Sequence, residues 1–523
     1  MSRLDPVESH TQPCYIVTIP VRIQRSKVRL NMNPHKNAFI RKTTPLRRHL
    51  TGLLGLISTV AFADPPNILL FVADDMGMGD IGAYDATSSI PTPQMDALAA
   101  GGRLMHNAHS PAAVCTPSRF GILTGTYPFR ANLTDGVLRS AYDPPLLSPD
   151  RETMPVMLRR VGYRTAAFGK WHLGMKWTGK DGKSVAKPGV DTSQFSTRDI
   201  DFSQPIIEGP LDYGFDYFFG IGSSINHGPY TFVENRMVTE TPTELREEIK
   251  INGKPYREGW VAPSWTDDGQ GEVISGQALA FMEKELADPG TPFFIYYAAV
   301  APHWPWVPAK TLHGESLEGT GGDDDKAPWR NDMVVQNDRI LSAFVELLKD
   351  PNGDGDPGDS QLENTLIIVT SDNGADVGTY EPLRGKKGQI YEGGHRVPCI
   401  VHWPAQIEAG SASDELVGLI DLYRSFGTLT GLEPDAEAAG DSIDMLPLFL
   451  GTGSQKRAPM LTQDWGKTTT FAVHDGPWKL ITREGEAVEL YDLGEDLKET
   501  RNVLKMHPER VEEMLQIWEQ AQK

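Results

Sequence analysis

Two acidic segments of the sequence have residue types suited to binding a hard metal ion. Asp74 and Asp75 follow the apolar run Asn67–Ala73, and Asp372 and Asn373 follow a second apolar run. Adjacent buried carboxylates repel each other, so such a pair needs a compensating cation. Carboxylate and amide oxygens favour calcium or magnesium over zinc. Each segment also has a simpler interpretation, as a solvated acidic loop or an Asn-Gly turn.

Other segments carry lysines and histidines that could bind an anion and move a proton. Lys170 and His172 follow one apolar run, His303 follows another, and a glycine-rich loop contains Lys386 and Lys387. An ammonium group neutralises an anionic oxygen, and imidazole exchanges protons near neutral pH. Taken singly, a histidine is more often structural than catalytic, and the lysine loop has the composition of a flexible surface loop.

The elements that must position these groups alternate along the chain. We predict strands at Asn67–Ala73, Arg164–Phe168, Phe293–Val300 and Thr365–Thr370. We predict helices at Thr92–Ala100, Thr153–Val161 and Met333–Leu348. This alternation indicates an α/β fold with a large, mostly parallel or mixed central sheet flanked by helices. Ligand sites in such sheets form at the carboxyl edge, so we expect the chemical groups to converge there.

The predicted secondary structure changes after about Met460. Short predicted strands at Thr470–His474, Trp478–Thr482 and Ala487–Leu490 are separated by turn residues, and the amphipathic helix Pro508–Gln520 follows. We therefore expect a main domain over residues 64–455 and a smaller α+β domain over residues 456–523, made of an antiparallel sheet and a helix.

Composition and charge limit the kinds of ligand that the protein is expected to bind. The apolar fraction of 39% and the charged fraction of 23% are typical of a soluble globular protein. The formal net charge of -20 argues against a nucleic-acid ligand, which needs basic patches. The same charge gives no long-range attraction for a polyanion, so an anionic ligand must be captured by a local cationic pocket.

Residues 1–63 are predicted to be a leader that ends in a secretory signal. Arg47 and Arg48 precede the apolar run Leu50–Val60, and Ala61-Phe62-Ala63 forms a small-x-small cleavage site. The apolar run is too short to span a membrane. We expect an exported protein, periplasmic or secreted. Residues 1–31 exceed what a signal needs, so Met32 is the preferred start, and a genuine long leader is the alternative.

Cysteine usage excludes a disulfide scaffold in the exported protein. Removal of the leader takes away Cys14 and leaves Cys115 and Cys399. Two cysteines in an exported chain of this length do not make a disulfide framework. Cys399 is expected to be a buried thiol in the apolar run Val397–Trp403.

The segment Cys115-Thr116-Pro117-Ser118-Arg119, continued by Phe120–Gly125, resembles the signature of the type I sulfatases. The acidic, lysine and histidine segments occur in the order found in that family, so the resemblance covers nearly the whole mature chain. It implies an alkaline-phosphatase-like fold and an arylsulfatase-like hydrolysis of sulfate monoesters. It also implies that a formylglycine-generating enzyme oxidises Cys115 to formylglycine, whose hydrate is the nucleophile.

The resemblance assigns a metal site. It implies that the cation, usually Ca2+ with Mg2+ possible, is bound by Asp74, Asp75, Asp372, Asn373 and the formylglycine at Cys115. Such a cation would stabilise the sulfate oxygens and lower the pKa of a hydroxyl of the aldehyde hydrate.

The resemblance also assigns catalytic roles. Arg119 would hold the aldehyde hydrate, and Lys170 and Lys387 would contact sulfate oxygens. His172 would hold the formylglycine hydroxyl or assist release of sulfate. His303 would protonate the leaving alcohol, which is the oxygen on which charge develops.

The substrate is expected to be a sulfated carbohydrate or an aryl sulfate. Trp304, Trp306 and His227 could border the pocket, with the aromatic rings stacked on a sugar face. Core or rim packing is an equally good interpretation of these residues. A serine of the family pocket has its counterpart in Ser224 or Ser223.

Three alternatives remain open at this level. The chain could hydrolyse phosphate or phosphonate esters, because enzymes related to the sulfatases share the metal site. It could also be an unmodified, non-catalytic carbohydrate-binding relative. The acidic segment Asp350–Asp359 is similar to a calcium loop, but Gln361 stands where a bidentate Glu is expected, so a solvated loop is the favoured interpretation.

Overall fold

The computed structural model describes residues 65–133, 136–184, 199–251, 253–322, 327–378, 382–432, 439–466 and 469–523. The predicted leader, Met32 and Cys14 lie outside the described residues. Within the described ranges, no helix is long and apolar enough to cross a membrane.

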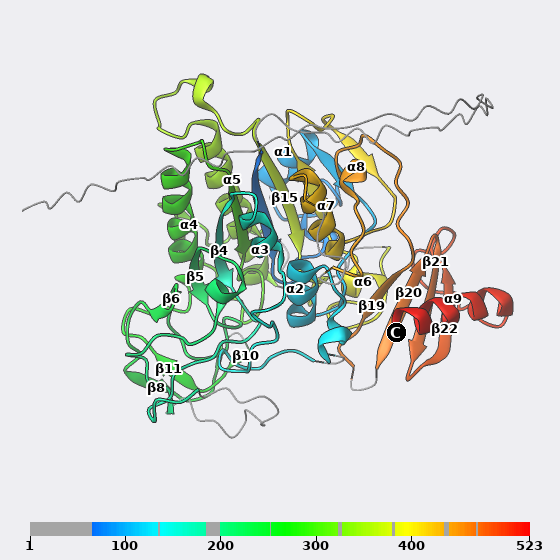
Figure 1. Ribbon diagram of the computed structural model, residues 1–523, viewed down its shortest axis with the longest axis horizontal. Coiled ribbons are helices and arrows are strands. Elements are labelled where there is room, and N and C mark those ends of the chain that lie inside the picture. The colour runs from blue at the N-terminus through cyan, green and yellow to red at the C-terminus, as the bar shows by residue number, and fades with distance from the viewer. Residues whose placement is uncertain are drawn as a thin grey trace, which may run out of the picture. The chain divides into compact units, whose positions relative to one another are not determined.

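A ten-stranded mixed sheet forms the centre of the molecule (Figure 1). Its strand order is β17-β2-β16-β15-β1-β12-β4-β5-β6-β7. The strands are β1 (Asn67–Ala73), β2 (Arg103–Met105), β4 (Arg164–Lys170), β5 (Tyr217–Ile221), β6 (Val233–Glu234), β7 (Met237–Val238), β12 (Phe293–Ala298), β15 (Thr365–Ser371), β16 (Cys399–His402) and β17 (Ser411–Ser413). The five central strands, β15 to β5, are parallel, whereas β16, β6 and β7 are antiparallel to their neighbours. The predicted α/β fold with a mixed central sheet is confirmed.

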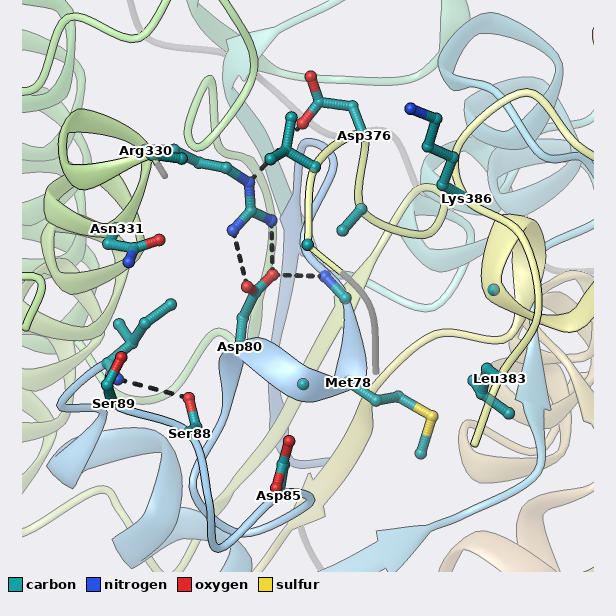
Figure 2. A pocket seen from close by; sticks show the side chains of 18 of the residues that line it. Met78, Asp80, Asp85, Ser88, Ser89, Arg330, Asn331, Asp376, Leu383 and Lys386 are labelled. Carbon is teal, nitrogen blue, oxygen red and sulfur yellow. Dashed lines mark hydrogen bonds and ion pairs between the residues drawn. The ribbon is translucent and has the colours of Figure 1, made fainter. Parts of the chain in front are cut away.

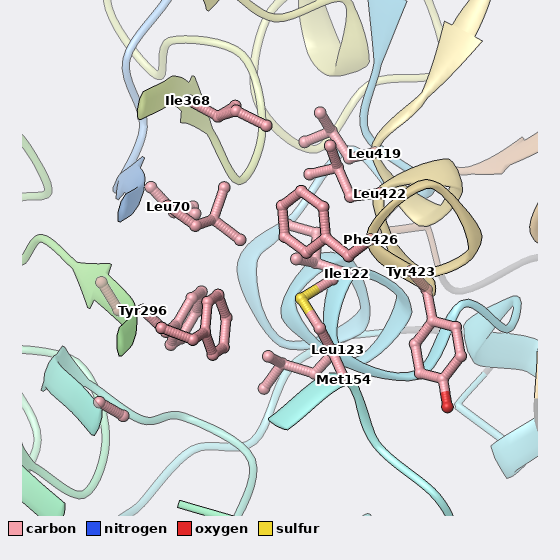
Figure 3. Close-up of a cluster of buried hydrophobic side chains, with 14 of the residues drawn as sticks. Leu70, Ile122, Leu123, Met154, Tyr296, Ile368, Leu419, Leu422, Tyr423 and Phe426 are labelled. Atoms are coloured by element: carbon pink, nitrogen blue, oxygen red, sulfur yellow. The ribbon is translucent and has the colours of Figure 1, made fainter. Parts of the chain in front are cut away.

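Helices cover both faces of this sheet. They are α1 (Pro93–Ala100), α2 (Cys115–Thr124), α3 (Met154–Arg159), α4 (Gln270–Leu286), α5 (Pro328–Lys349), α7 (Leu422–Leu429) and α8 (Leu446–Phe449). The one-turn helix α6 (Glu392–His395) lies between β15 and β16 in the chain. Every residue of β1 is buried, which explains its continuous apolar sequence. Leu70 faces a cluster with residues of α2, α3 and α7 (Figure 3), whereas Phe71 faces a cluster with residues of α1, α4 and α5.

The carboxy-terminal part of the chain forms its own antiparallel sheet. The strands β19 (Met460–Gln463), β20 (Thr470–Asp475), β21 (Trp478–Arg483) and β22 (Glu486–Asp492) pair in chain order. Helix α9 (Pro508–Ala521) packs against this sheet through Met514, which shares a cluster with Val473 and Leu480. The predicted strands and helix are present here, and β19 is one strand more than the sequence analysis predicted.

Short two-stranded sheets complete the described structure. They consist of β3 (Ala108–His109) with β18 (Val417–Gly418), β8 (Glu244–Arg246) with β11 (Gly259–Val261), β9 (Ile249–Ile251) with β10 (Lys254–Tyr256), and β13 (Thr311–Leu312) with β14 (Glu315–Ser316). The β3–β18 pair brings the segment before Cys115 close to the carboxy-terminal third of the chain.

Candidate active site

The register of the parallel strands brings the predicted acidic residues together. Ala73 at the end of β1 pairs with Ser371 at the end of β15, so the residues that follow are neighbours. The backbone amide of Asp372 donates to Ala73 O at 3.0 Å, and the amide of Asp75 donates to Asp372 Oδ1 at 3.2 Å. Asp75 adopts a left-handed backbone with φ of 72°, which turns the chain away from the strand direction.

The neighbouring strands add the basic residues to the same edge. Ala298 of β12 pairs with Gly169 of β4, which places Lys170 beside the end of β12, the strand next to β1. Strand β4 continues through Lys170, two residues beyond the predicted end, because its pairing with β5 also continues to this residue. His303 lies beyond β12, close enough to Asp75 for its Nε2 to be 3.8 Å from Asp75 Oδ2.

Cys115 is the first residue of α2 and points into this group of side chains. Its Sγ lies 4.0 Å from Asp75 Oδ1, and only 2% of the residue is exposed. Pro117 fits in the first turn because the backbone N–H groups there have no intrahelical acceptor. Arg119 lies one helical turn after Cys115 and therefore faces the same site. Burial raises the pKa of the Cys115 thiol to about 12, so an unmodified thiol here is protonated at neutral pH.

Three cations and three carboxylates form ion pairs in the site. Lys170 Nζ donates to both oxygens of Asp74, at 2.9 and 2.8 Å. Arg119 Nε donates to Asp372 Oδ2 at 2.9 Å, and Arg119 NH2 forms an ion pair with the same oxygen at 2.8 Å. These four side chains are fully buried.

The third pair is Lys387 and Asp75, whose Nζ and Oδ2 are 2.7 Å apart. Burial alone would raise the pKa of Asp75, but Lys387 and His303 hold it below its usual value. Lys387 is held in place by its own backbone amide, which donates to Ala375 O at 2.9 Å. The neighbouring Lys386 is exposed and forms part of a separate cavity wall.

The donor set has the chemistry of a site for a hard divalent cation. Asn373 Nδ2 donates to Asp75 Oδ1 at 2.8 Å, whereas Asn373 Oδ1 is buried without a hydrogen-bond partner among the described residues. Atoms of Asp74, Asp75, Cys115 and His303 lie within 4.8 Å of one another. A buried amide oxygen without a donor is unfavourable, and a cation beside two carboxylates would satisfy it. The residues present therefore fit a calcium or magnesium ion.

The histidines of the site are neutral in this arrangement. Burial, with Lys387 next in importance, holds the pKa of His303 well below its usual value, and burial does the same for His172. His172 Nε2 is 2.8 Å from Leu138 O, which leaves its buried Nδ1 without a partner in the described structure. Ser224 Oγ is 3.4 Å from His303 Nε2, so Ser224 is nearer to the site than Ser223.

The residues predicted to border a substrate lie around these histidines. The His227 ring centroid is 6.0 Å from that of His172, and Ser223 Oγ is 2.9 Å from His227 Nδ1. The ring of Trp304 stacks on His303 with 5.3 Å between centroids. Trp306 and Trp304 both lie beneath Lys254 Nζ, at 5.0 and 5.5 Å from their ring centroids.

Arg330 supports the acidic loop and was not identified from the sequence. It donates to both oxygens of Asp80, at 2.7 Å from NH1 and 2.6 Å from NH2, and NH2 also donates to Asp75 O at 3.1 Å. Figure 2 shows this pair in the wall of a cavity of about 580 Å3. None of the metal ligands and catalytic residues predicted above lines this cavity. A single arginine in a long helix gives no sequence signal for such a role.

The acidic segment Asp350–Asp359 is mostly exposed. Its carboxylates accept backbone N–H groups of their own loop, as Asp350 does from Asp354 and Gly355 at 3.1 and 3.0 Å. Asp350, Asp354 and Asp359 offer oxygens that lie near one another, as exposed acidic groups often do. These local bonds fit the favoured interpretation of a solvated loop.

Family comparisons agree with the geometry of the site. A family model described as sulfatase matches residues 66–432, and a model described as the carboxy-terminal part of N-sulphoglucosamine sulphohydrolase matches residues 385–522.

Individual proteins similar to this chain are also sulfatases. The chain is 30% identical over 520 residues to an N-acetylgalactosamine-6-O-sulfatase of Bacteroides thetaiotaomicron, covering 87% of this chain and 92% of the relative. It is 32% identical over 399 residues to the N-acetylgalactosamine-6-sulfatase of Sus scrofa, covering 74% of this chain and 66% of that enzyme.

Solved structures share the fold. A structure from work on the metabolism of multiple glycosaminoglycans by Bacteroides thetaiotaomicron has a TM-score of 0.72 and 28% identity, and the match covers 88% of this chain and 100% of the other. A phosphonate monoester hydrolase of Agrobacterium radiobacter has a TM-score of 0.56 and 18% identity over 87% of this chain and 96% of its own. At that identity the second likeness concerns the fold alone.

Proposed function

Because this chain belongs to the sulfatase family and hydrolyses sulfate monoesters, we propose that its substrate is a 6-sulfated N-acetylgalactosamine residue of a carbohydrate. We also propose that the nucleophile is a formylglycine made from Cys115 and that the cation is Ca2+, with Mg2+ as the alternative. The sugar assignment is supported by the bacterial and porcine relatives, which are N-acetylgalactosamine-6-sulfatases.

The observation that carries the proposed mechanism is the set of charged groups around residue 115. Asp74, Asp75 and Asp372 balance Lys170, Lys387 and Arg119, so these six side chains have no net charge. A bound divalent cation then leaves the site positive, which favours a sulfate monoester. This local charge explains how a protein with a net charge of -20 can capture an anion.

The metal site would be formed by Asp74, Asp75, Asp372, Asn373 and residue 115. The cation would supply electrophilic stabilisation of a sulfate oxygen and favour ionisation of the nucleophile. Asn373 contributes the oxygen that has no other partner in the described structure.

The remaining residues would bind sulfate and move protons. Lys170 and Lys387 would turn from their carboxylates toward sulfate oxygens once the cation takes over those carboxylates. The negative charge of a bound sulfate monoester would raise the pKa of His303 and favour its protonated form. His303 would then donate a proton to the oxygen of the departing sugar, since that oxygen gains charge as the S–O bond breaks. Arg119 and His172 would hold the oxygens of residue 115.

The residues that surround His172 and His303 would contact the sugar. Ser224 and His227 lie beside the two catalytic histidines, and Trp304 extends the surface formed by His303. We propose that Trp304 stacks on the sugar ring and that Trp306 supports Trp304 through their shared contact with Lys254.

Export of the enzyme belongs to the same proposal. The charged, apolar and cleavage regions of residues 47–63 are the support, and the mature chain would begin at Asp64. Amino-terminal sequencing of the protein recovered from its native host would show this residue first. A mature protein that retains residues 32–63 would contradict export by this signal.

The test is sulfate release from a set of defined substrates. The enzyme, produced with a formylglycine-generating enzyme, would be assayed on 6-sulfated and 4-sulfated N-acetylgalactosamine, 6-sulfated glucosamine, and nitrophenyl sulfate, phosphate and phosphonate. We expect the highest kcat/KM on 6-sulfated N-acetylgalactosamine. A higher kcat/KM on another sugar would overturn the sugar assignment, and dominant phosphonate cleavage would overturn the sulfatase mechanism.

Two cysteine variants separate the nucleophile from general effects. Cys115→Ala should abolish turnover, whereas Cys399→Ala, which changes the buried thiol of β16, should retain it per folded molecule. Equal loss in both variants would show that the assay reports folding rather than the nucleophile.

A further inference from the structure

A second buried cluster of ionisable side chains lies where β3 and α6 meet β20, apart from the site described above. Atoms of His109, Glu392, His395 and His474 lie within 4.8 Å of one another. His474 is 1% exposed and the other three residues are fully buried. The three histidines come from segments far apart in the sequence, so their meeting is a product of the tertiary fold.

The outer ring nitrogens of two of these histidines are held by oxygens that can only accept. His109 Nε2 is 2.8 Å from Asn107 Oδ1, and Asn107 Nδ2 donates to Asp414 O at 3.2 Å, which fixes the orientation of the amide. His395 Nε2 is 2.9 Å from Ile390 O. His109 Nε2 therefore carries the proton of a neutral ring and leaves a lone pair on Nδ1. His395 Nε2 lies between the acceptor Ile390 O and the ammonium group of Lys479, which is 3.2 Å away.

The inner ring nitrogens of His109 and His395 lie close together. His109 Nδ1 and His395 Nδ1 are 3.0 Å apart. A metal ion would accept a lone pair from each, whereas a proton on His395 Nδ1 would make a hydrogen bond to His109 Nδ1. His474 Nε2 is also buried without a hydrogen-bond partner in the described part of the chain. The cluster thus combines one ring nitrogen that lacks a partner with two that can share a ligand.

The shared ligand could be a proton or a metal ion, and the geometry favours a metal. A proton between His109 and His395 leaves the buried His474 Nε2 without a partner, whereas a metal ion bound by all three rings would satisfy it. Burial lowers the pKa of all three histidines, which favours the neutral ring that binds a metal. Zn–N bonds of roughly 2.0–2.1 Å at a tetrahedral angle separate two nitrogens by about 3.3 Å, close to the observed spacing.

We propose that His109, His395 and His474, with Glu392 as the fourth ligand, form a binding site for a divalent transition metal of the zinc class. Three imidazoles and one carboxylate favour zinc over calcium, which takes oxygen ligands. Hydrogen bonds from the outer ring nitrogens to Asn107 and Ile390 have the arrangement that orients metal-bound histidines elsewhere.

The charge around the cluster is balanced before a metal binds. Lys479 Nζ lies 2.9 Å from Glu392 Oε1 and 2.8 Å from Glu499 Oε1, and Arg396 NH1 lies 3.2 Å from Glu392 Oε2. Lys479 Nζ is also 3.2 Å from His395 Nε2. Because this ammonium group opposes any added cation, the three neutral imidazoles must provide most of the binding free energy.

A cavity gives the metal a route to this site. Asn107, Arg396 and His474 line a cavity of about 760 Å3 between the β3–β18 region and the carboxy-terminal sheet. A metal ion in this cavity would therefore meet Asn107, which hydrogen-bonds His109, and the proposed ligand His474.

The metal would fasten the carboxy-terminal sheet to the loops of the active site. His474 belongs to β20, whereas His109 and His395 belong to segments that contact the catalytic residues. Ser110 links the two sites, because its amide donates to His395 O at 2.8 Å and its Oγ donates to Asp372 O at 2.6 Å. Zinc binding should stabilise this junction as well as the fold.

The test measures metal binding directly. Full-length enzyme would be stripped with a chelator and reloaded with Ca2+ alone or with Ca2+ and Zn2+, and bound metal would be counted by mass spectrometry. We expect one equivalent of zinc in the wild type, its loss in His474→Gln, and its retention in His507→Gln, an exposed histidine in the same part of the chain. Asp372→Asn should lose calcium and keep zinc. Co2+ in place of Zn2+ should give the visible absorption of a tetrahedral nitrogen site.

Defined outcomes would overturn the zinc site. The proposal would be wrong if the wild-type enzyme bound no more zinc than His474→Gln. It would also be wrong if zinc binding were lost in Asp372→Asn, because that zinc would occupy the catalytic site. If His474→Gln does not fold, Asn107→Ala keeps all four ligands and should weaken zinc binding by roughly 10- to 100-fold. Unchanged affinity in that variant, or a wild-type protein without the cobalt absorption, would contradict the proposal.

Discussion

At the scale of residues, the site combines a cysteine that is inert as a thiol with groups that suit a modified nucleophile. Burial raises the pKa of Cys115 to about 12, so the unmodified residue would be a poor nucleophile at neutral pH. The acidic and basic residues predicted from strand ends do lie together around it, because the strands are parallel and in register. The zinc-type cluster was not predicted, since isolated histidines carry no sequence signal.

The proposed acid role of His303 predicts a dependence on the leaving group. His303→Ala should reduce kcat by about 10²- to 10⁴-fold on a sugar sulfate, whose alkoxide is a poor leaving group. The loss on nitrophenyl sulfate should be much smaller, because nitrophenolate leaves without a proton. Steady-state kinetics on both substrates measure the difference, and equal losses would argue against the acid role.

The proposed calcium site predicts a specific loss of metal. Asp372→Asn keeps the size of the side chain but removes a charge, so calcium affinity should fall by more than about 100-fold. Asp338→Asn is the matched control, because Asp338 is buried and accepts the amides of Gln94 and Met95 outside the site. Calcium titration monitored by calorimetry compares the two variants. Wild-type affinity in Asp372→Asn would refute this ligand assignment.

At the scale of elements, the sequence predicted the segments whose apolar pattern fits only one type of secondary structure. Strands β1, β12 and β15 are short and fully buried, so their apolar runs identified them. Helix α2 was missed because all ten of its residues are buried, which removes the amphipathic period. Helix α4 has apolar residues at Ile274, Ala278 and Phe281, but two glycines within it weaken the helical signal.

Close contact between strands β4 and β12 predicts a large effect at one glycine. Gly169 has φ of 95°, and a Cβ added there would lie 2.0 Å from Ala298 O. Gly162 has a similar φ of 93°, but its added Cβ would meet nothing within 4 Å. Gly162→Ala should cost about 1–2 kcal/mol of unfolding free energy from backbone strain alone.

Gly169→Ala should cost a further ~1–3 kcal/mol, because the strands must move apart. It should also lower activity, since Lys170 follows directly in β4. Denaturant unfolding and sulfate release measure the two effects. Equal stability of the two alanine variants would show that the contact with Ala298 O does not destabilise Gly169→Ala.

At the scale of the whole molecule, the negative charge of the protein opposes its anionic substrate. With a net charge of -20, attraction is confined to the site around residue 115, which a bound divalent cation would make positive. The kcat/KM for a sulfated oligosaccharide should therefore rise modestly as ionic strength increases from about 10 mM to about 150 mM, because salt screens the long-range repulsion. A steep fall of kcat/KM over this range would indicate a basic substrate-binding surface instead.

The nature of residue 115 in the active enzyme tests the account most directly. Peptide mass spectrometry of enzyme that releases sulfate should show the peptide containing residue 115 lighter by roughly 18 Da than its sequence predicts, which is the change from cysteine to formylglycine. The modified fraction should rise in proportion to specific activity across preparations. Full sulfatase activity in a preparation whose Cys115 is entirely unmodified would contradict the account.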